Sequence, residues 1–339
     1  MRAALYDPAG GYYQRSDLER WGREGDYRTS PERSELFAAT FARYFAKLYE
    51  ELQRPEDWTI VECGAGDGRF AASVLRALAN RFPLVFAATH YLVYELSDDA
   101  LRRARQRLGE FGARVEFYSD FDRVTARRGI YFSNELLDAF PVHRVMKTGD
   151  GLAELYVDLD SEGRFVWSTG PLSTGRLVDY CRAHSIDPAE GQIIEINLAI
   201  DDWLARVAGK LDEGFLITVD YGEEASELYD SARRPHGSLR GFLRHGFVED
   251  VLAQPGECDL TTTINWTQVR RASEFKVIEF ASQDKFLLNA GLLEELELML
   301  GNAQTDAEKL TLSTSAREMI LPGGMAASFQ VLVHKKHKG

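Results

Sequence analysis

The chain has 339 residues, of which 45% are hydrophobic, and it carries a formal net charge of −13. A chain of this length and apolar content can bury one large core or two modest ones, so a folded protein is expected. The negative charge argues against nucleic acid as the main partner, because phosphate binding needs concentrated Lys and Arg, but it is compatible with a basic protein segment.

The three cysteines, Cys63, Cys181 and Cys258, are scattered and form no CxxC pair. They predict neither a zinc site nor a disulfide framework, and they favour a reducing compartment. No apolar run approaches the roughly 18 residues that a membrane span needs. The opening MRAALYDPAGGYY lacks the apolar segment of a signal peptide. We therefore expect no membrane span and a cytoplasmic location.

From about residue 58 the sequence alternates strand and helix patterns. The short apolar runs WTIVEC, HYLVYEL, ARVEFYSD and GIYFSN predict four strands, and the apolar spacing in RFAASVLRALANRF predicts a helix after the first of them. SDDALRRARQRLGEFG predicts the next helix, with Ser97 as its N-cap. This alternation is typical of a parallel, doubly wound sheet.

The regular alternation stops after the fourth strand. AELYVDLDSEGRFVWST predicts a hairpin, while TGRLVDYCRAHS and LAIDDWLARVAGKLDEG predict helices. GFLITVDYG predicts the fifth strand of the sheet, and FKVIEFAS and ASFQVLVHKK predict late strands that suit antiparallel pairing. We therefore expect an α/β fold with a cap at 1–50, a core at 51–140 and 214–339, and an inserted segment at 141–213.

The glycine loop VECGAGDGRF lies between the first strand and its helix. Gly64, Gly66 and Gly68 let the backbone turn tightly and approach a ligand. A dinucleotide loop has GxGxxG, whereas this loop has GxGxG, with Arg69 in place of the third Gly and with Glu62 two residues before the first. S-adenosylmethionine fits better, because a strand-end carboxylate suits its ammonium group, directly or through water. A dinucleotide-dependent oxidoreductase and a purely structural turn are the alternatives.

Two acidic residues follow the next strands. Glu95 lies 31 residues (95 − 64) after Gly64, the distance of one helix and one strand, and can accept both ribose hydroxyls. Asp120 follows the third strand and is the natural acceptor for an adenine amino group, with Phe121 able to pack on the ring. A solvent-facing carboxylate at Glu95, and an ordinary turn residue at Asp120 or the neighbouring Asp122, are the alternatives.

Eight motifs occur along the chain in the order YDPAGGYY, GDYRTSPERSELF, VECGAGDGRF, SNELLDAFPVHR, VDYG, GSLRGF, DLTTTINW and SQDKFLLNAG. Together they resemble the MidA-type methyltransferases, relatives of the mitochondrial complex I assembly factor that methylates an arginine. The resemblance implies a class I S-adenosylmethionine-dependent methyltransferase, with a protein arginine as acceptor and a link to respiratory complex assembly. In that family the DLT motif is followed two residues later by His, where this chain has Thr263.

The resemblance also implies a lid. In a class I fold the pocket at the strand ends is open above, and residues 25–32 would fold over it and exclude water. Thr29 or Ser30 would cap the following helix, with Pro31 at its first position. Thr29 is therefore counted among the donor-binding residues. An ordinary entry into a helix is the alternative.

Methyl transfer to arginine requires carboxylates that grip the charged guanidinium and direct one nitrogen toward the methyl group. SNELLDAFPVHR follows the fourth strand, and we expect Asn134, Glu135 and Asp138 to present the acceptor, the two acids on one side of a helical turn. His143 is a candidate general base or substrate contact, and Glu195 is a further candidate carboxylate. The alternatives are acids that only favour a helix N-terminus and a structural His143.

The sequence thus predicts an S-adenosylmethionine-dependent protein arginine methyltransferase that needs no metal. Two other functions stay open. One is methylation of a small molecule or another nucleophile at the same donor site. The other is a non-catalytic assembly factor that kept the fold.

Overall fold

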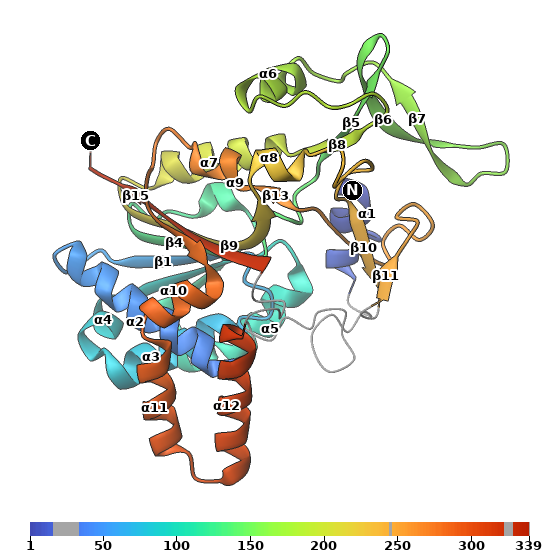
Figure 1. Cartoon of the computed structure of the whole chain (residues 1–339). Helices are drawn as coiled ribbons and strands as arrows, with labels where there is room; N and C mark the ends of the chain where they lie inside the picture. Colours follow the sequence, from blue (N-terminus) through green and yellow to red (C-terminus); the bar gives the residue numbers. More distant parts are fainter. Residues whose placement is uncertain (16–33, 244–245, 322–327, 339) are drawn as a thin grey trace. The chain divides into compact units, whose positions relative to one another are not determined.

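The computed structural model is shown in Figure 1. The residues that it describes are 1–15, 34–243, 246–321 and 328–338. They form two compact units: unit 1 comprises Met1–Arg28, Leu136–Arg206 and Tyr221–Ser273, and unit 2 comprises Thr29–Glu135, Val207–Asp220 and Glu274–Gly339. Strand β9 (Glu213–Glu223) and helix α7 (Leu198–Lys210) continue from one unit into the other.

Unit 2 is built on a mixed, mostly parallel sheet with strand order β14-β15-β9-β4-β1-β2-β3. Its strands besides β9 are β1 (Thr59–Cys63), β2 (His90–Tyr94), β3 (Val115–Tyr118), β4 (Arg128–Asn134), β14 (Lys276–Ser282) and β15 (Phe329–Lys336). The pairs β1–β2, β1–β4, β2–β3 and β4–β9 are parallel, whereas β14 and β15 are antiparallel. The predicted α/β fold is confirmed.

The helices of unit 2 follow the predicted alternation. They are α2 (Glu35–Glu51), α3 (Arg69–Arg81), α4 (Pro83–Ala88), α5 (Asp98–Arg107), α10 (Gln283–Asn289), α11 (Leu292–Asn302) and α12 (Asp306–Ile320), with short 3₁₀ turns at Gly109–Arg114 (η3) and Phe121–Arg123 (η4). Helix α5 starts as expected, because the Ser97 hydroxyl accepts the N–H of Ala100 and two Asp residues occupy the first turn.

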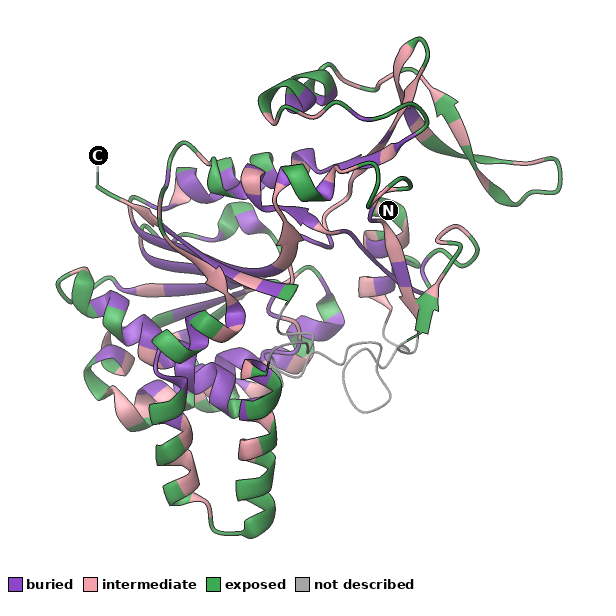
Figure 2. Cartoon of the chain, in the orientation of Figure 1, coloured by how far each residue is buried: buried purple, intermediate pink, exposed green. Residues whose placement is uncertain are grey.

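An aromatic cluster joins the helices of unit 2 to its sheet. Phe132 of β4 is 1% exposed and stacks on Phe70 of α3, with ring centroids 4.6 Å apart. Phe41 of α2 lies 5.0 Å from Phe132 and 5.5 Å from Phe286 of α10. Each such pair contributes about 0.5–1.5 kcal/mol beyond the buried area. Figure 2 shows β1 and β4 buried, so the strand ends that carry the site are held rigidly.

The segment between the fourth and fifth strands of the central sheet has a sheet of its own in unit 1. Its strands, in the order β7-β6-β5-β8, are β5 (His143–Thr148), β6 (Gly151–Leu159), β7 (Phe165–Gly170) and β8 (Ile193–Ile196), all paired antiparallel. The predicted hairpin is β6–β7, with Leu159 opposite Phe165. Helix α6 (Arg176–Ala183) covers one face by packing Leu177 and Tyr180 around Val145.

The remainder of unit 1 contains a small sheet and short helices. These elements are α1 (Arg2–Tyr6), η1 (Tyr12–Gln14), α8 (Ala225–Leu228), β10 (Arg240–Leu243), β11 (Gly246–Val248), β12 (Asp259–Thr261), β13 (Ile264–Asn265) and α9 (Trp266–Arg270). Strand β10 pairs antiparallel with β11 and β12. The start of the chain packs here, with Leu5 and Tyr12 buried against Leu260. Within the described ranges, no helix is long and apolar enough to cross a membrane.

Candidate functional site

The glycine loop connects β1 to α3 in the conformation that its composition predicts. Gly64, Gly66 and Gly68 have φ angles of 74°, 54° and 74°, a region that other residues rarely adopt. At Gly68 an added Cβ would lie 2.9 Å from the Cβ of Ala104, so α3 and α5 could not approach as closely with another residue there. The N–H of Gly64 donates to the carbonyl of Tyr94 at the end of β2 (2.9 Å).

Glu95 lies against this loop. Its Oε2 accepts the N–H of Gly66 and its Oε1 accepts the N–H of Ser97, each at 2.9 Å. A carboxylate oxygen can accept two hydrogen bonds, so both oxygens keep capacity for one further donor. The half-buried Glu95 carboxylate, fixed beside an open glycine backbone, fits the two hydroxyls of a ribose.

Glu62 has a partner within the sheet. It is 5% exposed and accepts the hydroxyl of Tyr91 on the adjacent strand at 2.7 Å. The pKa of Tyr91 is raised well above its ordinary value, mainly by burial and further by the charge and the hydrogen bond of Glu62. Tyr91 therefore stays a hydrogen-bond donor to Glu62 at the base of the loop. The sequence patterns did not single out Tyr91.

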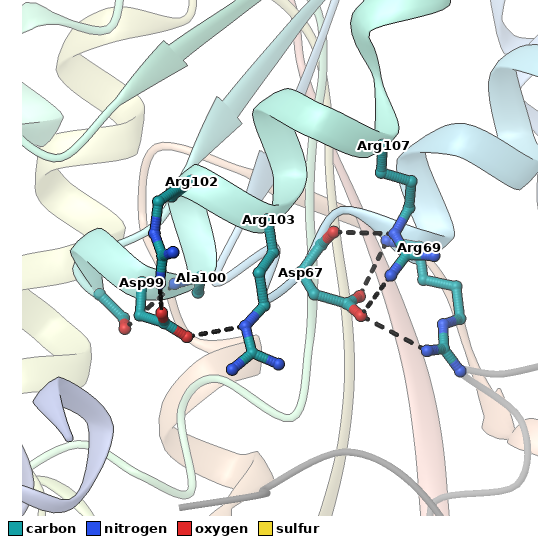
Figure 3. A network of polar contacts seen from close by, with 8 residues as sticks. Asp67, Arg69, Asp99, Ala100, Arg102, Arg103 and Arg107 are labelled. Atoms are coloured by element: carbon teal, nitrogen blue, oxygen red, sulfur yellow. Dashed lines mark hydrogen bonds and ion pairs between the residues drawn. The ribbon is translucent and has the colours of Figure 1, made fainter. Parts of the chain in front are cut away.

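Asp67 joins the glycine loop to α5, as Figure 3 shows. Its carboxylate receives Arg107 at 2.7 Å, and its carbonyl receives the Nε of Arg107 at 3.1 Å. Arg69 is the first residue of α3, and its N–H donates to Asp67 at 3.2 Å. Arg69 therefore holds the end of the glycine loop at the start of α3 through its bond to Asp67. Asp67 and Arg107 were not identified from the sequence, because their contact joins residues that are 40 positions apart.

Asp120 is exposed, and its carboxylate caps η4 by accepting the N–H of Asp122 at 2.9 Å. Phe121 is 1% exposed and packs on Tyr94 (5.1 Å) and Tyr131 (6.2 Å), so it belongs to the core. The adenine contact of Asp120 stays a prediction.

Asn134 and Glu135 lie at the same sheet edge as the glycine loop, because Ser133 pairs with Cys63 in parallel register. Glu135 has φ +49°, its N–H donates to Val219 of β9 at 2.9 Å, and its carboxylate receives Asn134 at 3.4 Å. The predicted helical turn is wrong, and residues 135–140 form an irregular turn. The hydrogen bond from Glu135 to Val219 extends the β4–β9 ladder, and Glu135 itself has a positive φ, which a helix does not allow.

Asp138 belongs to unit 1 and lies in a cluster drawn from separate motifs. Its Oδ2 accepts the hydroxyls of Tyr221 (2.5 Å) and Thr261 (2.6 Å). Arg240 stacks on the Tyr221 ring at 4.9 Å and donates to Thr263 at 3.1 Å. From the sequence, Tyr221 and Thr261 are expected only to line the acceptor cleft or to hold its walls, and Arg240 has no predicted role.

His143 is paired across β5 and β6. Its Nδ1 lies 2.7 Å from Oε1 of Glu154, which is 5% exposed and also receives the N–H of Ser173 at 2.6 Å. Burial raises the pKa of Glu154, but hydrogen bonds from His143 and Ser173 outweigh it, and the result lies below the ordinary value. In the tautomer whose Nδ1–H donates to Glu154, Nε2 is the acceptor nitrogen of the ring.

The carboxylate of Glu195 is hydrogen-bonded to other residues of unit 1. It accepts Arg144 at 3.0 Å and the main-chain N–H of Ser238, and a Cβ at Gly237 would lie 2.3 Å from it. The absence of a side chain at Gly237, the first residue of GSLRGF, leaves room for the Glu195 carboxylate. Glu195 therefore holds this loop in place. Thr29 and the predicted lid at 25–32 lie outside the described residues.

Comparison with known proteins places this geometry among methyltransferases. Residues 40–280 match the model of a family described as "Putative S-adenosyl-L-methionine-dependent methyltransferase". Over its full length the chain is 27% identical to the protein arginine methyltransferase NDUFAF7 of mouse mitochondria and 26% identical to the human protein, covering 80% of each.

A solved structure from Burkholderia thailandensis, bound to S-adenosyl-homocysteine, is similar across 100% of this chain and 87% of its own. Its TM-score is 0.85 and its sequence identity is 29%. Among the described residues, no three or more His, Cys, Asp and Glu side chains are grouped to hold a metal ion.

Proposed function

Because the chain belongs to the family of S-adenosyl-L-methionine-dependent methyltransferases, we propose that it methylates an arginine side chain of a protein substrate. The donor half rests on one observation, the Glu95 carboxylate fixed against the backbone of Gly66. The acceptor half rests on similarity along the whole chain to relatives named protein arginine methyltransferases.

The donor supplies an electrophilic methyl group on its sulfonium. We assign Glu95 to its ribose hydroxyls, Glu62 to its ammonium, Asp120 to its adenine amino group, and Thr29 to the cover above it. Gly64, Gly66 and Gly68 leave room for the ligand, since none presents a side chain. These assignments agree with the sheet edge at which the glycine loop and Asn134 lie.

The acceptor poses a different problem. A guanidinium is charged and delocalised, with a pKa above about 12, so carboxylates must hold it and localise its lone pair. We assign Asn134, Glu135 and Asp138 to this task, and His143 to proton acceptance. No covalent intermediate is needed, because correct approach of one nitrogen to the methyl group is the main requirement.

Labelled S-adenosylmethionine tests the reaction class. The purified protein should transfer the methyl group to proteins of a cell lysate, and hydrolysis should yield methylarginine. Label in a metabolite fraction alone would instead favour the small-molecule alternative. Donor binding without transfer to any fraction would favour the assembly-factor alternative. Cytoplasmic location and a link to respiratory complexes stay predictions, and the relatives named above are mitochondrial.

Replacement of Glu95 tests the donor site. Glu95→Ala should weaken S-adenosylhomocysteine binding by about 10- to 100-fold, because two hydrogen bonds to a charged group are lost. The matched control is Glu116→Ala, which removes an acidic residue from the neighbouring strand β3 and should bind normally. Titration calorimetry of both folded variants measures the effect, and equal affinity would remove Glu95 from the site.

A further inference from the structure

Among the described residues, one carboxylate oxygen of Asp138 has no hydrogen-bond partner. The residue is 7% exposed, and both hydroxyls that reach it, from Tyr221 and Thr261, contact Oδ2 and also contact each other. Its Oδ1 is buried and accepts no hydrogen bond from the described residues. An unsatisfied buried acceptor is costly, and more so when it is charged, so this oxygen of a motif residue is a candidate contact for a ligand.

The surrounding chain prevents Asp138 from turning to satisfy that oxygen. Its carbonyl accepts the N–H of Thr262 at 3.0 Å, and the preceding carbonyl, of Leu137, accepts the side chain of Asn197 at 3.3 Å. The main chain is thus fixed on both peptide units. With Oδ2 fixed by two hydroxyls, the direction of Oδ1 is also fixed.

We infer that Asp138 Oδ1 receives an N–H of the guanidinium of the methyl acceptor, and that Tyr221 and Thr261 are positioning residues for that carboxylate. The inference rests on the proposed function, and it assigns roles to two residues outside the donor site. Tyr221 and Thr261 act through Asp138 and need not touch the substrate.

The chemistry of the cluster selects a guanidinium. A buried carboxylate is stabilised best by a cation that also donates hydrogen bonds, and arginine offers five donors in a planar fork. Tyr221, Arg240 and Thr263 are half-buried and so are more exposed than Asp138.

Burial raises the pKa of Asp138 above its ordinary value, although hydrogen bonds from Thr261 and Tyr221 and the charge of Arg240 act against it. A bound guanidinium would favour the ionised form further.

Arg240 is the rival cation within the chain. Its guanidinium stacks on the Tyr221 ring and donates to Thr263, so it is engaged by those two residues. Thr263 stands where the resembled family has His, so this chain uses that position to hold Arg240. Arg240 therefore leaves Oδ1 available to a substrate.

Binding measurements test the inference directly. The probe is the peptide acetyl-Gly-Arg-Gly-amide, titrated by NMR into protein saturated with S-adenosylhomocysteine, with the lysine peptide for comparison. Asp138→Asn should weaken arginine-peptide binding at least about tenfold, and Tyr221→Phe and Thr261→Val about three- to tenfold each. Thr261→Ser keeps the hydroxyl and should restore affinity. Tyr13→Phe removes a matched Tyr-to-Asp bond to Asp259, at the start of the strand that carries Thr261, and should have no effect.

Two further measurements separate positioning from structural damage. S-adenosylhomocysteine affinity should stay near that of the wild type in Tyr221→Phe and Thr261→Val, and both variants should still unfold cooperatively. In an Asp138→Asn background, Tyr221→Phe should add less than twofold, because it acts through the lost carboxylate.

Failure of the inference can be told from failure of the proposed function. If the wild type makes methylarginine but all three substitutions leave peptide affinity unchanged, or if the wild type does not bind the arginine peptide, the inference is wrong and the function stands. Absence of methylarginine with the wild-type protein would instead overturn the proposed function.

Discussion

Glu135 carries backbone strain at a strand end. Its φ of +49° is uncommon for a residue with a side chain, and its N–H is bonded to β9, so the surrounding sheet enforces the conformation. Glycine would adopt this backbone without cost, yet the chain has an acid here. We therefore expect the carboxylate to have a function that offsets the strain, and the proposed role in holding the acceptor would be such a function.

Two substitutions separate the strain of Glu135 from its chemistry. Glu135→Ala and Glu135→Gly both remove the carboxylate and should lower methyl transfer alike, by about 100-fold. The Gly variant should be more stable than the Ala variant by about 1 kcal/mol, because Ala retains the positive φ. Urea unfolding and methyl-transfer rates give the two answers. Activity near the wild-type level in either variant would show Glu135 to be purely structural.

Single residues in this chain were predictable where local chemistry decides. Ser97 caps α5 as its hydroxyl suggests, and Glu95 faces the glycine loop because both end parallel neighbouring strands. Tyr91, Tyr221 and Thr261 could not be assigned, since each acts through one bond to a residue that is distant in the sequence. No periodicity or motif spacing encodes those contacts.

At the scale of elements, prediction failed where long-range pairing overrode local preference. Acids three apart at 135 and 138 favour a helix start, but the β4–β9 ladder continues into Glu135 and leaves no room for one. The hairpin β6–β7 was predictable because Ser-Glu-Gly forms its turn and alternating residues flank it. The same hairpin brings Glu154 to His143, a pairing that only the register of β5 with β6 shows.

The β5–β6 pair permits a test of His143. His143→Gln should lower kcat by about 100-fold or more if His143 accepts the proton. Glu154→Gln should lower it less, about tenfold, because the imidazole loses only the carboxylate that orients it. Glu162→Gln, at the turn of the same hairpin, is the control. A kcat that is insensitive to His143→Gln at every pH would make the dyad structural.

At the scale of the whole molecule, the residues singled out from the sequence are divided between the two units. The predicted donor residues and Glu135 belong to unit 2, while Asp138, His143 and the motifs at 221–263 belong to unit 1. The alternation of strands and helices in the sequence predicted the parallel strands of unit 2. Unit 1 has no such alternation, because its three-stranded and four-stranded sheets are antiparallel.

His334 makes the stability of the central sheet depend on pH. It lies in β15, is 0% exposed, and neither ring nitrogen has a hydrogen-bond partner among the described residues. Burial lowers the pKa of His334 to about 4, from an ordinary value of 6.5. The folded chain therefore prefers neutral imidazole, and its stability is fully present above pH 6.5 and is lost as the pH falls toward 4.

This difference predicts a loss of about 3 kcal/mol between pH 7 and pH 4 from His334 alone. His334→Leu removes the titrating group, so its free energy of unfolding should fall by about 3 kcal/mol less than that of the wild type over this range. His90→Gln, at an exposed position of β2, should behave as the wild type does. Urea unfolding at both pH values measures the three proteins. Equal losses in wild type and His334→Leu would mean that the imidazole finds a proton acceptor or water in solution, and that β15 is less closely packed than the structure shows.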